Sequence, residues 1–465
     1  MSMTRTQRNP PRAVQLTDNP KAGRRGQRWM HFVRGWTNQL FAWVDQAIIS
    51  ATSFATLIVL GSWTDPSTLG AYAVAASVLA MLIASQDALI TRPYSIRLHH
   101  GTPTEHAFSA LMLSMAFAAS STLLLCAVAL VFNTFETGRA AAPMAAMLAS
   151  IIPLILLREF ARRYAFAHLR PVQATMLDAI VAVLNLALLS WLGWTGRLSA
   201  LTALGSLGIA CGVGALGWLF LMRTQFAFRW AKIPGAFRQS WRLGKWLLSG
   251  HLAAQAQGYV TLWLSLVIGG AVTTGIYTAS MSILSFANPL LFGFYNTLTP
   301  RSVRALRLKG PAGLRRQAAG DSLSLALLMG PFCLLIFLFG ADMLRFFYPA
   351  AGYGADTHLL TILALATSAG AVGVPASAAL SSAERTRIVA AVMIAAAALN
   401  LSLVSILMTH FGLLGAAYGM LLAEVTASLA VWAAFLMSFH NLQPMIHRST
   451  AISVDAVATS VPAAT

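Results

Sequence analysis

The chain has 465 residues, of which 57% are hydrophobic and only 10% are charged. An average soluble protein carries roughly 25% charged residues, so this composition excludes a chain built of soluble domains. Five long stretches contain no Asp, Glu, Lys or Arg: 107–135, 198–222, 246–300, 357–383 and 388–423. Because a membrane-spanning helix needs about 20 mostly apolar residues, the sequence predicts an all-α polytopic membrane protein.

Twelve membrane-spanning helices are predicted in chain order. They cover 36–61, 68–91, 107–132, 141–161, 171–193, 199–222, 246–268, 274–299, 319–341, 357–380, 388–409 and 412–438. With this assignment, Arg139, Arg197 and Arg345 are the only basic residues on one side of the membrane, and the other 29 of the 32 lie on the opposite side. The positive-inside rule then places both termini in the cytoplasm. The net charge of +18 thus reflects membrane topology, and no nucleic-acid partner is expected.

The predicted spans divide the chain into two halves of six helices, 34–222 and 246–438. A basic cytoplasmic linker at 223–245 joins them, a disordered basic tail is expected at 1–33, and a second cytoplasmic tail follows at 439–465. No inserted soluble domain, glycine-rich phosphate loop, catalytic triad or metal-spaced His/Cys cluster is found in the sequence. We therefore expect no enzyme activity, no cofactor and no metal site.

Three short motifs recur in the same order in corresponding helices of the two halves. They are Gly-x-Tyr at 70–72 and 275–277, Leu-Asn-Leu-x-Leu-x-Ser at 184–190 and 399–405, and Gly-x-x-Gly at 205–208 and 412–415. Since six is an even number, the two halves share one orientation in the membrane. Parallel repeats of this kind are typical of alternating-access transporters with a central site between the halves.

At these motifs the sequence resembles a known family. The segments LGAYAVAASVL, TGIYTASMSIL, LTPR at 298–301 and the run from Arg387 to Glu424 are similar to polysaccharide-biosynthesis flippases of the multidrug/oligosaccharidyl-lipid/polysaccharide (MOP) exporter superfamily. The resemblance covers about 36–438. It implies two parallel six-helix repeats around a central cavity and movement of lipid-linked oligosaccharides across the bacterial inner membrane.

Carboxylates inside predicted spans need a reason, because a charge at the bilayer centre costs about 2.5–3.5 kcal/mol on insertion scales. Asp45, Asp178 and Glu424 are the residues in question. One hypothesis makes them coupling carboxylates that bind a proton or another cation. The alternative is that each pairs with a cationic side chain or a hydrogen-bond donor and fixes helix packing.

Basic residues at predicted helix ends are candidates for binding an anionic head group. Arg92, Arg158 and Arg301 are selected, since Arg92 and Arg301 end repeat-related helices and a pyrophosphate needs cationic donors. Positive-inside placement is the alternative explanation for these arginines and for Arg162 and Arg163, which also pair with Glu159 at helical spacing.

Uncharged polar residues are the expected lining of a sugar-binding cavity. They are Gln46, His251, Gln255, Ser282, Ser285 and Asn296. The alternative is that they make helix–helix hydrogen bonds. A kink is also predicted at Pro289.

The leading functional hypothesis is a flippase that moves an undecaprenyl-pyrophosphate oligosaccharide for exopolysaccharide or O-antigen synthesis. Its expected partners are that lipid-linked substrate, membrane lipids and a polysaccharide polymerase or export apparatus. The first alternative is a cation-coupled multidrug exporter of the same superfamily. The second is a membrane-embedded sugar polymerase or acyltransferase, which the short outer loops and the duplicated halves disfavour.

The unequal distribution of Lys and Arg generates a topology prediction. A reporter fused after His447 should be active only in the cytoplasm, and one inserted in 342–356 only in the periplasm. Activity of both reporters on the same side would contradict the twelve-span assignment.

Overall fold

The computed structural model describes residues 20–440 apart from 99–102, 227–229, 351 and 354–356. Helices account for nearly all of these residues. The long helices are α1 (Pro20–Trp63), α2 (Pro66–Gln86), α4 (Pro103–Thr134), α5 (Ala142–Ala167), α6 (Pro171–Trp194), α7 (Ala200–Met222), α8 (Ile233–Leu284), α9 (Asn288–Phe347), α10 (Thr357–Ser382) and α11 (Thr386–His440). The short elements are η1 (Asp87–Thr91), α3 (Arg92–Arg97), η2 (Glu136–Gly138), η3 (Arg223–Gln225), η4 (Trp230–Lys232) and η5 (Ser285–Ala287).

The three longest helical elements each contain a chain reversal at a glycine. Gly270 in α8, Gly310 in α9 and Gly412 in α11 have φ values of 76°, 63° and 60°. Glycine adopts this left-handed region readily because it lacks a Cβ atom. Within the described residues, nine continuous stretches are long and apolar enough to cross a membrane, and two of these stretches contain the three reversals. The structure therefore has the twelve predicted crossings.

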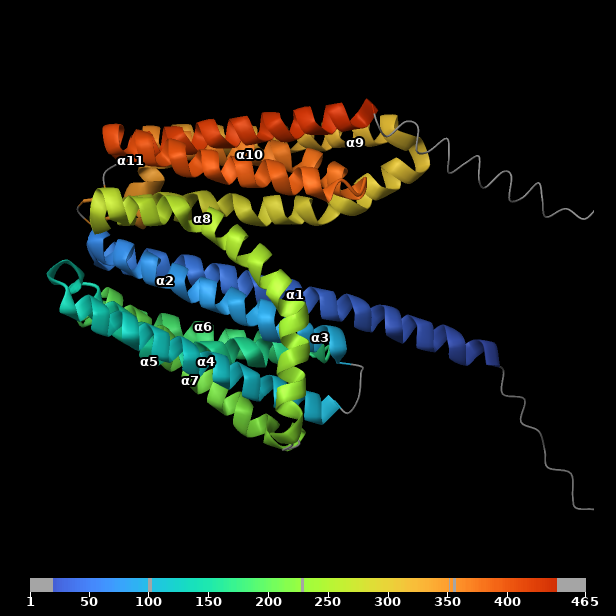
Figure 1. Ribbon diagram of the computed structural model, residues 1–465, viewed down its shortest axis with the longest axis horizontal. Coiled ribbons are helices and arrows are strands. Elements are labelled where there is room, and N and C mark those ends of the chain that lie inside the picture. The colour runs from blue at the N-terminus through green and yellow to red at the C-terminus, as the bar shows by residue number, and fades with distance from the viewer. Residues whose placement is uncertain (1–19, 99–102, 227–229, 351, 354–356, 441–465) are drawn as a thin grey trace, which may run out of the picture.

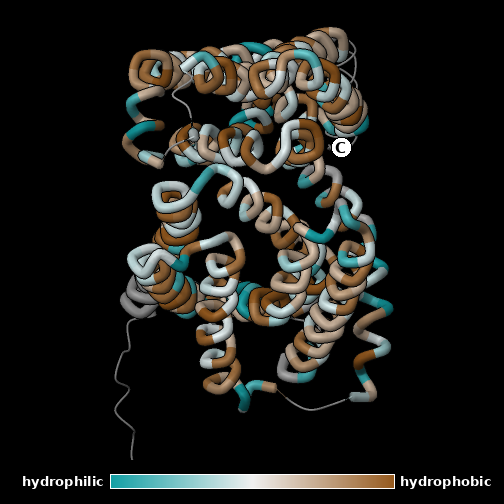
Figure 2. Tube along the Cα trace, turned by 90° about the vertical axis from the view of Figure 1, so that its left-hand side faces the viewer, coloured by the Kyte–Doolittle hydropathy of each residue, from teal (hydrophilic) through white to brown (hydrophobic). Residues whose placement is uncertain are grey.

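The helices form two six-helix halves, which Figure 1 shows one above the other. The first half contains α1 to α7; the second contains α9 to α11 and the membrane-crossing part of α8. Figure 2, which looks nearly along the helices, shows hydrophobic segments throughout the bundle with hydrophilic segments scattered among them. Large apolar side chains such as Leu123, Phe220 and Val267 are mostly exposed, as expected for a lipid-facing surface.

The bundle has two ends, a basic end and an opposite end. The basic end carries the connections near 92–103, 168–171, 223–232, 300–311 and 383–386. The opposite end carries those near 64–65, 135–141, 195–199, 269–270 and 348–356.

At the opposite end, the two halves meet through the repeated Gly-x-Tyr motifs. A Cβ atom on Gly70 would lie 2.1 Å from the carbonyl oxygen of Ala271, and one on Gly275 would lie 1.8 Å from that of Pro66. The backbones of α2 and α8 thus touch directly at the two repeat-equivalent glycines. Around this crossing, one hydrophobic core extends through both halves, with Leu60 buried on one side and Ile283 on the other.

Two further contacts, from α8 to α2 and from Tyr348 to α1, join the halves. The indole of Trp263 in α8 donates a 2.9 Å hydrogen bond to the Ser77 hydroxyl in α2. On α1, Gly61 packs against the ring of Tyr348, which a Cβ atom would approach to 2.3 Å. We call this contact between the two halves at the opposite end the seal. It is made by small residues that face backbone atoms or large aromatic side chains.

At the basic end, the first turns of α8 cross back onto the first half, as Figure 1 shows. Lys232, just before α8, pairs with Glu105 of α4. Further along, Gly244 packs on the backbone of Leu89 in the π-helix η1, where a Cβ atom would lie 2.8 Å from the Leu89 Cα. The described part of the predicted linker 223–245 is therefore largely helical and touches the first half at Lys232 and Gly244, although most of its residues are exposed.

Some local features differ from the sequence-based expectations. Helix α1 begins at Pro20, inside the segment expected to be a disordered tail; residues 1–19 and 441–465 lie outside the described residues. The predicted kink falls at the 3-10 turn η5, and Pro289 lies in the first turn of α9. Its missing N–H costs no helical hydrogen bond at that position.

The glycine crossing generates a stability prediction. Gly70→Ala and Gly275→Ala should each force the halves apart, because the added methyl group meets backbone rather than a mobile side chain. We expect each substitution to cost about 1–3 kcal/mol, typical of overpacking, and to lower the melting temperature of the purified protein. Gly258→Ala is the matched control, since nothing lies within 4 Å of its added Cβ atom. Equal melting temperatures for all three variants would contradict this role.

Candidate functional site

A buried set of charges lies inside the first half, where α1, α5 and α6 pack together. Arg162 of α5 donates from Nη2 to Asp45 Oδ2 of α1 at 2.7 Å and from Nε to Asp178 Oδ2 of α6 at 2.8 Å. One helical turn earlier, Arg158 pairs with Asp178 and also with Glu159, the latter at 3.2 Å. Two arginines on one face of α5 thus connect three helices.

The same set of charges continues towards the basic end through η1. Arg163 Nε lies 2.9 Å from Glu159 and 3.5 Å from Asp87. Asp87 also accepts hydrogen bonds from Arg92 Nε at 2.7 Å and from the Thr91 hydroxyl at 2.6 Å. A π-helix adds one residue to the helical turn and often marks a functional position; here it begins with the carboxylate that joins Arg92 to Arg163.

We call this set the charge cluster. Its members are Asp45, Asp87, Arg92, Arg158, Glu159, Arg162, Arg163 and Asp178. It contains four carboxylates and four guanidinium groups, so its formal charges cancel. This balance is the condition under which buried charges are tolerated in a low-dielectric interior.

Burial within the charge cluster is uneven. The side chains of Asp45 and Asp178 are 0% exposed, whereas those of Arg158 and Arg162 are 15% and 12% exposed. Arg92 is 45% exposed. Since the Asp87 and Glu159 side chains are only 5% and 6% exposed, the accessible surface of the charge cluster is mostly guanidinium. The accessible part of the charge cluster is therefore cationic, although the formal charges of its members add up to zero.

The structure places the three predicted coupling carboxylates in two different settings. Asp45 and Asp178 belong to the charge cluster and are ion-paired, as the packing alternative for these residues anticipated. Glu424 lies in the second half on α11, and its carboxylate packs against Gly370 of α10. The coupling role of these carboxylates remains a prediction.

The three predicted head-group arginines do not come together. Arg92 and Arg158 are linked through the charge cluster, but Arg301 lies on α9 in the other half. Arg301 Nη1 is 3.3 Å from Asp321, its side chain is 51% exposed, and its guanidinium group lies 5.7 Å from the centre of the Phe294 ring. A head group bound at the charge cluster could therefore contact Arg92 and Arg158, which belong to one network of ion pairs. It would not reach Arg301.

The predicted polar lining is also divided. Ser282 is buried and shares a 2.6 Å hydrogen bond with the Tyr348 hydroxyl, which is a contact between α8 and the end of α9. Ser285 donates to the backbone oxygen of Ser282 at 2.5 Å. Gln46 and Asn296 are exposed, and His251 and Gln255 are half-buried on α8. Ser282 and Ser285 therefore make the helix hydrogen bonds expected under the alternative interpretation.

Sequence reasoning missed the central role of Arg162. The sequence places Arg162 at a helix end, where positive-inside placement and pairing with Glu159 are its explanations. The available signal was the spacing of Arg158 and Arg162, which puts two guanidinium groups on one helical face, together with two buried carboxylates that lacked a partner. Asp87 was missed because nothing in its neighbourhood indicates a π-helix.

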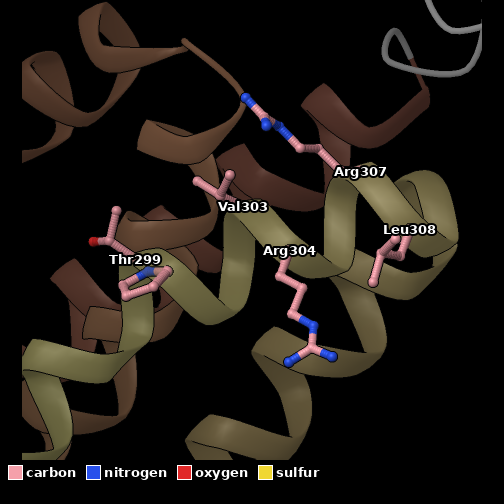
Figure 3. A pocket seen from close by; sticks show the side chains of 6 residues that line it. Thr299, Val303, Arg304, Arg307 and Leu308 are labelled. Atoms are coloured by element: carbon pink, nitrogen blue, oxygen red, sulfur yellow. The ribbon is translucent and has the colours of Figure 1, made fainter. Parts of the chain in front are cut away.

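The described surface has hollows at each end of the bundle, and the charge cluster lines neither of the two described next. One, of about 600 Å³, follows α9 at the basic end. It is lined by Thr299, Pro300, Val303, Arg304, Arg307 and Leu308. Figure 3 shows that Arg304 and Arg307 point to opposite sides of this helix. The other, of about 620 Å³, lies between α4 and α5 and reaches Arg139 at the opposite end. Among the described residues, no group of three or more His, Cys, Asp and Glu could hold a metal ion.

The ion pairs of Arg162 generate a prediction. Arg162→Met should leave Asp45 and Asp178 as buried charges with one cation fewer, and breaking a buried pair typically costs about 3–5 kcal/mol. The purified variant should therefore melt well below the wild-type protein. Arg345→Met is the control, because Arg345 pairs with Asp342 only at the exposed surface, at 3.7 Å. Adding Asp178→Asn to Arg162→Met should recover part of the loss, and no recovery would count against charge pairing as the cause.

Comparison with known proteins places this geometry in context. Residues 255–406 match the MatE family model. No curated protein matches the chain. The fold is similar to that of an inward-facing multidrug resistance MATE transporter of the MOP superfamily, with a TM-score of 0.70 at 14% identity, covering 87% of this chain and 99% of that one.

Two other solved structures show the same likeness. An outward-facing multidrug resistance MATE transporter gives a TM-score of 0.59 at 15% identity, covering 86% of this chain and 94% of that one. A MOP-superfamily transporter from Pyrococcus furiosus, described as having a binding pocket of reverse polarity that suggests a different function, gives 0.60 at 13% identity, covering 87% and 95%. Residues 255–406 therefore match the MatE model, and the chain has the two-repeat helical fold seen in these solved transporters.

Proposed function

We propose that this protein is an alternating-access exporter that takes up an amphipathic organic solute at the basic end and releases it at the opposite end, driven by a cation. The observation that carries the proposal is the seal made by Gly70 and Gly275. Two repeat-equivalent backbones touch at one end, while the charges and loops that would first meet a cytoplasmic solute gather at the other.

The conformation supports this direction. The chain is more similar to the inward-facing MATE structure than to the outward-facing one, with TM-scores of 0.70 and 0.59. Glycine contacts without interlocking side chains suit a seal that must open and close in each cycle. Separating the halves there breaks close packing and the Ser77–Trp263 hydrogen bond but, among the residues that the structure describes, no ion pair.

Multidrug export is the function that the comparisons favour. The MatE match and the solved multidrug transporters support it over a flippase. A cation-coupled exporter also needs a carboxylate that can accept and release its coupling ion, and the second half contains a mid-membrane carboxylate, Glu424, outside the charge cluster.

Flipping of a lipid-linked oligosaccharide is the second candidate, and the cationic face of the charge cluster favours it. Arg92, Arg158 and Arg162 present guanidinium groups while their carboxylate partners stay buried. Guanidinium groups bind pyrophosphate through charge-assisted, bidentate hydrogen bonds. An anionic head group would fit this face better than an organic cation would.

Two assays separate these candidates. Cells lacking the gene should retain more of a fluorescent organic cation and become more sensitive to it, and expression of the protein should reverse both effects if it is a multidrug exporter. If the protein is a flippase, drug accumulation should not change and an undecaprenyl-linked oligosaccharide should accumulate on the cytoplasmic leaflet. The absence of both phenotypes, together with no solute movement in proteoliposomes, would contradict export.

A crosslinking experiment tests alternating access directly. Thr68→Cys and Thr273→Cys flank the glycine crossing on α2 and α8, in a background from which Cys126, Cys211 and Cys333 have been removed. Joining the two introduced cysteines with a cleavable bifunctional thiol reagent should abolish transport, and cleaving the reagent should restore it. Undiminished transport by the crosslinked protein would show that the seal does not need to open.

A further inference from the structure

The first turns of α8, residues 233–245, run across the other helices at the basic end, as Figure 1 shows. We call these residues the transverse segment. It is the last part of the connection between the two halves, and this connection has an unusual composition. Residues 223–245 contain six Lys or Arg and no Asp or Glu. Export requires a connection here, but it does not require one so rich in cationic side chains.

Both ends of the transverse segment lie at the depth where membrane spans begin and end. At its start, Lys232 pairs with Glu105, the first residue of the apolar stretch of α4. At its end, Gly244 packs on Leu89, near the end of the apolar stretch that starts with α2. The 12 residues between these two contacts rise roughly 18 Å along the helix. The transverse segment therefore lies along the boundary between the bilayer and water.

The transverse segment has three different sides. Its less exposed residues recur at the spacing of one helical face and lie against the first half: Ile233, Ala236, Ser240 and Gly244. On the second side, Phe237 and Trp241 are 57% and 49% exposed, and their rings stack with centres 6.4 Å apart. Arg238 and Arg242 follow these rings by one residue, which turns them about 100° further around the helix. Both arginines are exposed, and neither has an ion-pair partner among the described residues.

Exposed rings next to unpaired arginines match the chemistry of a membrane surface. Tryptophan is enriched at the boundary between bilayer and water because its ring is amphipathic. A third exposed ring, Trp230, stands just before the transverse segment and packs on Phe108 of α4 at 5.4 Å. Each Lys or Arg near an anionic membrane surface strengthens the attraction about fivefold. A soluble acidic protein would match the arginines, but at this depth the bilayer already surrounds the helices and reaches the rings first.

We propose that the transverse segment binds anionic phospholipids of the leaflet at the basic end. Phe237 and Trp241 insert among the acyl chains, and Arg238 and Arg242 bind the phosphate groups. Guanidinium groups hold phosphate oxygens through two parallel hydrogen bonds. A lipid with net negative charge is preferred over phosphatidylcholine, because the choline group of the latter cancels the charge of its phosphate. Lipid binding here does not depend on which solute the protein moves.

A fluorophore at position 235 reports which lipids lie beside the transverse segment. Nothing lies within 4 Å of a Cβ atom added to Gly235, so Gly235→Cys should accept a label without displacing its neighbours. The full chain, with Cys126, Cys211 and Cys333 replaced by alanine, is placed in phosphatidylcholine bilayers. These contain a small fraction of either spin-labelled phosphatidylglycerol or spin-labelled phosphatidylcholine, and both probes quench fluorescence on contact.

The ratio of the two quenching efficiencies measures the lipid preference. We expect phosphatidylglycerol to quench several-fold more strongly at low salt. The excess should shrink at about 1 M NaCl, where the screening length falls to about 3 Å. Equal quenching by the two probes at low salt would overturn the proposal. A label shielded from both probes, together with a dimer in light scattering, would show that a second copy covers this surface and would also overturn it.

Two double variants separate local binding from net charge. Arg238→Gln with Arg242→Gln should bring the two probes close to equal quenching, since each arginine contributes about fivefold. Arg304→Gln with Arg307→Gln is the matched control, because it removes two exposed arginines from α9 at the same end of the other half (Figure 3). The control should keep the preference for phosphatidylglycerol. An unchanged preference in the first variant, or an equal loss in both, would contradict the assignment to the transverse segment.

A third variant tests insertion of the rings. Phe237→Ser with Trp241→Ser should lower quenching by both probes several-fold, because the segment loses its hold on the acyl chains. Its melting temperature should stay near that of the labelled parent, since both side chains are exposed. Undiminished quenching would contradict insertion. Native mass spectrometry of the unlabelled chain gives an independent measure: the wild-type protein should retain more phosphatidylglycerol than Arg238→Gln with Arg242→Gln, and equal retention would count against the proposal.

Discussion

The interaction on which the first half depends is the double ion pair of Arg162. Its guanidinium group binds Asp45 of α1 at 2.7 Å and Asp178 of α6 at 2.8 Å from a position on α5. In a membrane interior none of these charges is tolerable alone, so the three helices must keep one relative position. The close packing of Phe160, Tyr164 and Trp218 towards the basic end extends the same fixed arrangement.

The two halves, although related by repeats, have thus become chemically different. In the first half Asp45, Asp87, Glu159 and Asp178 each pair with an arginine, so the accessible charge of the charge cluster is cationic. In the second half Asp321 pairs with Arg301, whereas the Glu424 carboxylate packs against Gly370 and has no ion-pair partner among the described residues. The seal between the halves uses glycines and apolar packing, which can separate without breaking a buried ion pair.

The predicted roles of polar residues depended on partners that lie far away in the sequence. Asp45 and Arg162 are 117 positions apart, so no local pattern pairs them. Ser282 was expected to line a cavity, and its hydroxyl shares a hydrogen bond with that of Tyr348, 66 positions away. Arg92 and Arg301 occupy equivalent helix ends, yet Arg92 pairs with Asp87 in its own half and Arg301 with Asp321 in the other. Repeat symmetry predicted their positions in the helices but not their partners.

The sequence by itself determined the all-helical class, the twelve crossings and the duplicated halves. Hydrophobic length and repeated motifs are local properties, and the length of an apolar segment decides whether it can span the membrane as a helix. It also marked Asp45, Asp178 and Glu424 as charges in need of an explanation. Only the tertiary structure decided which of them has an arginine. Charge compensation depends on distances of a few ångströms between different helices, and packing of small residues such as Gly70, Gly275 and Gly370 sets those distances.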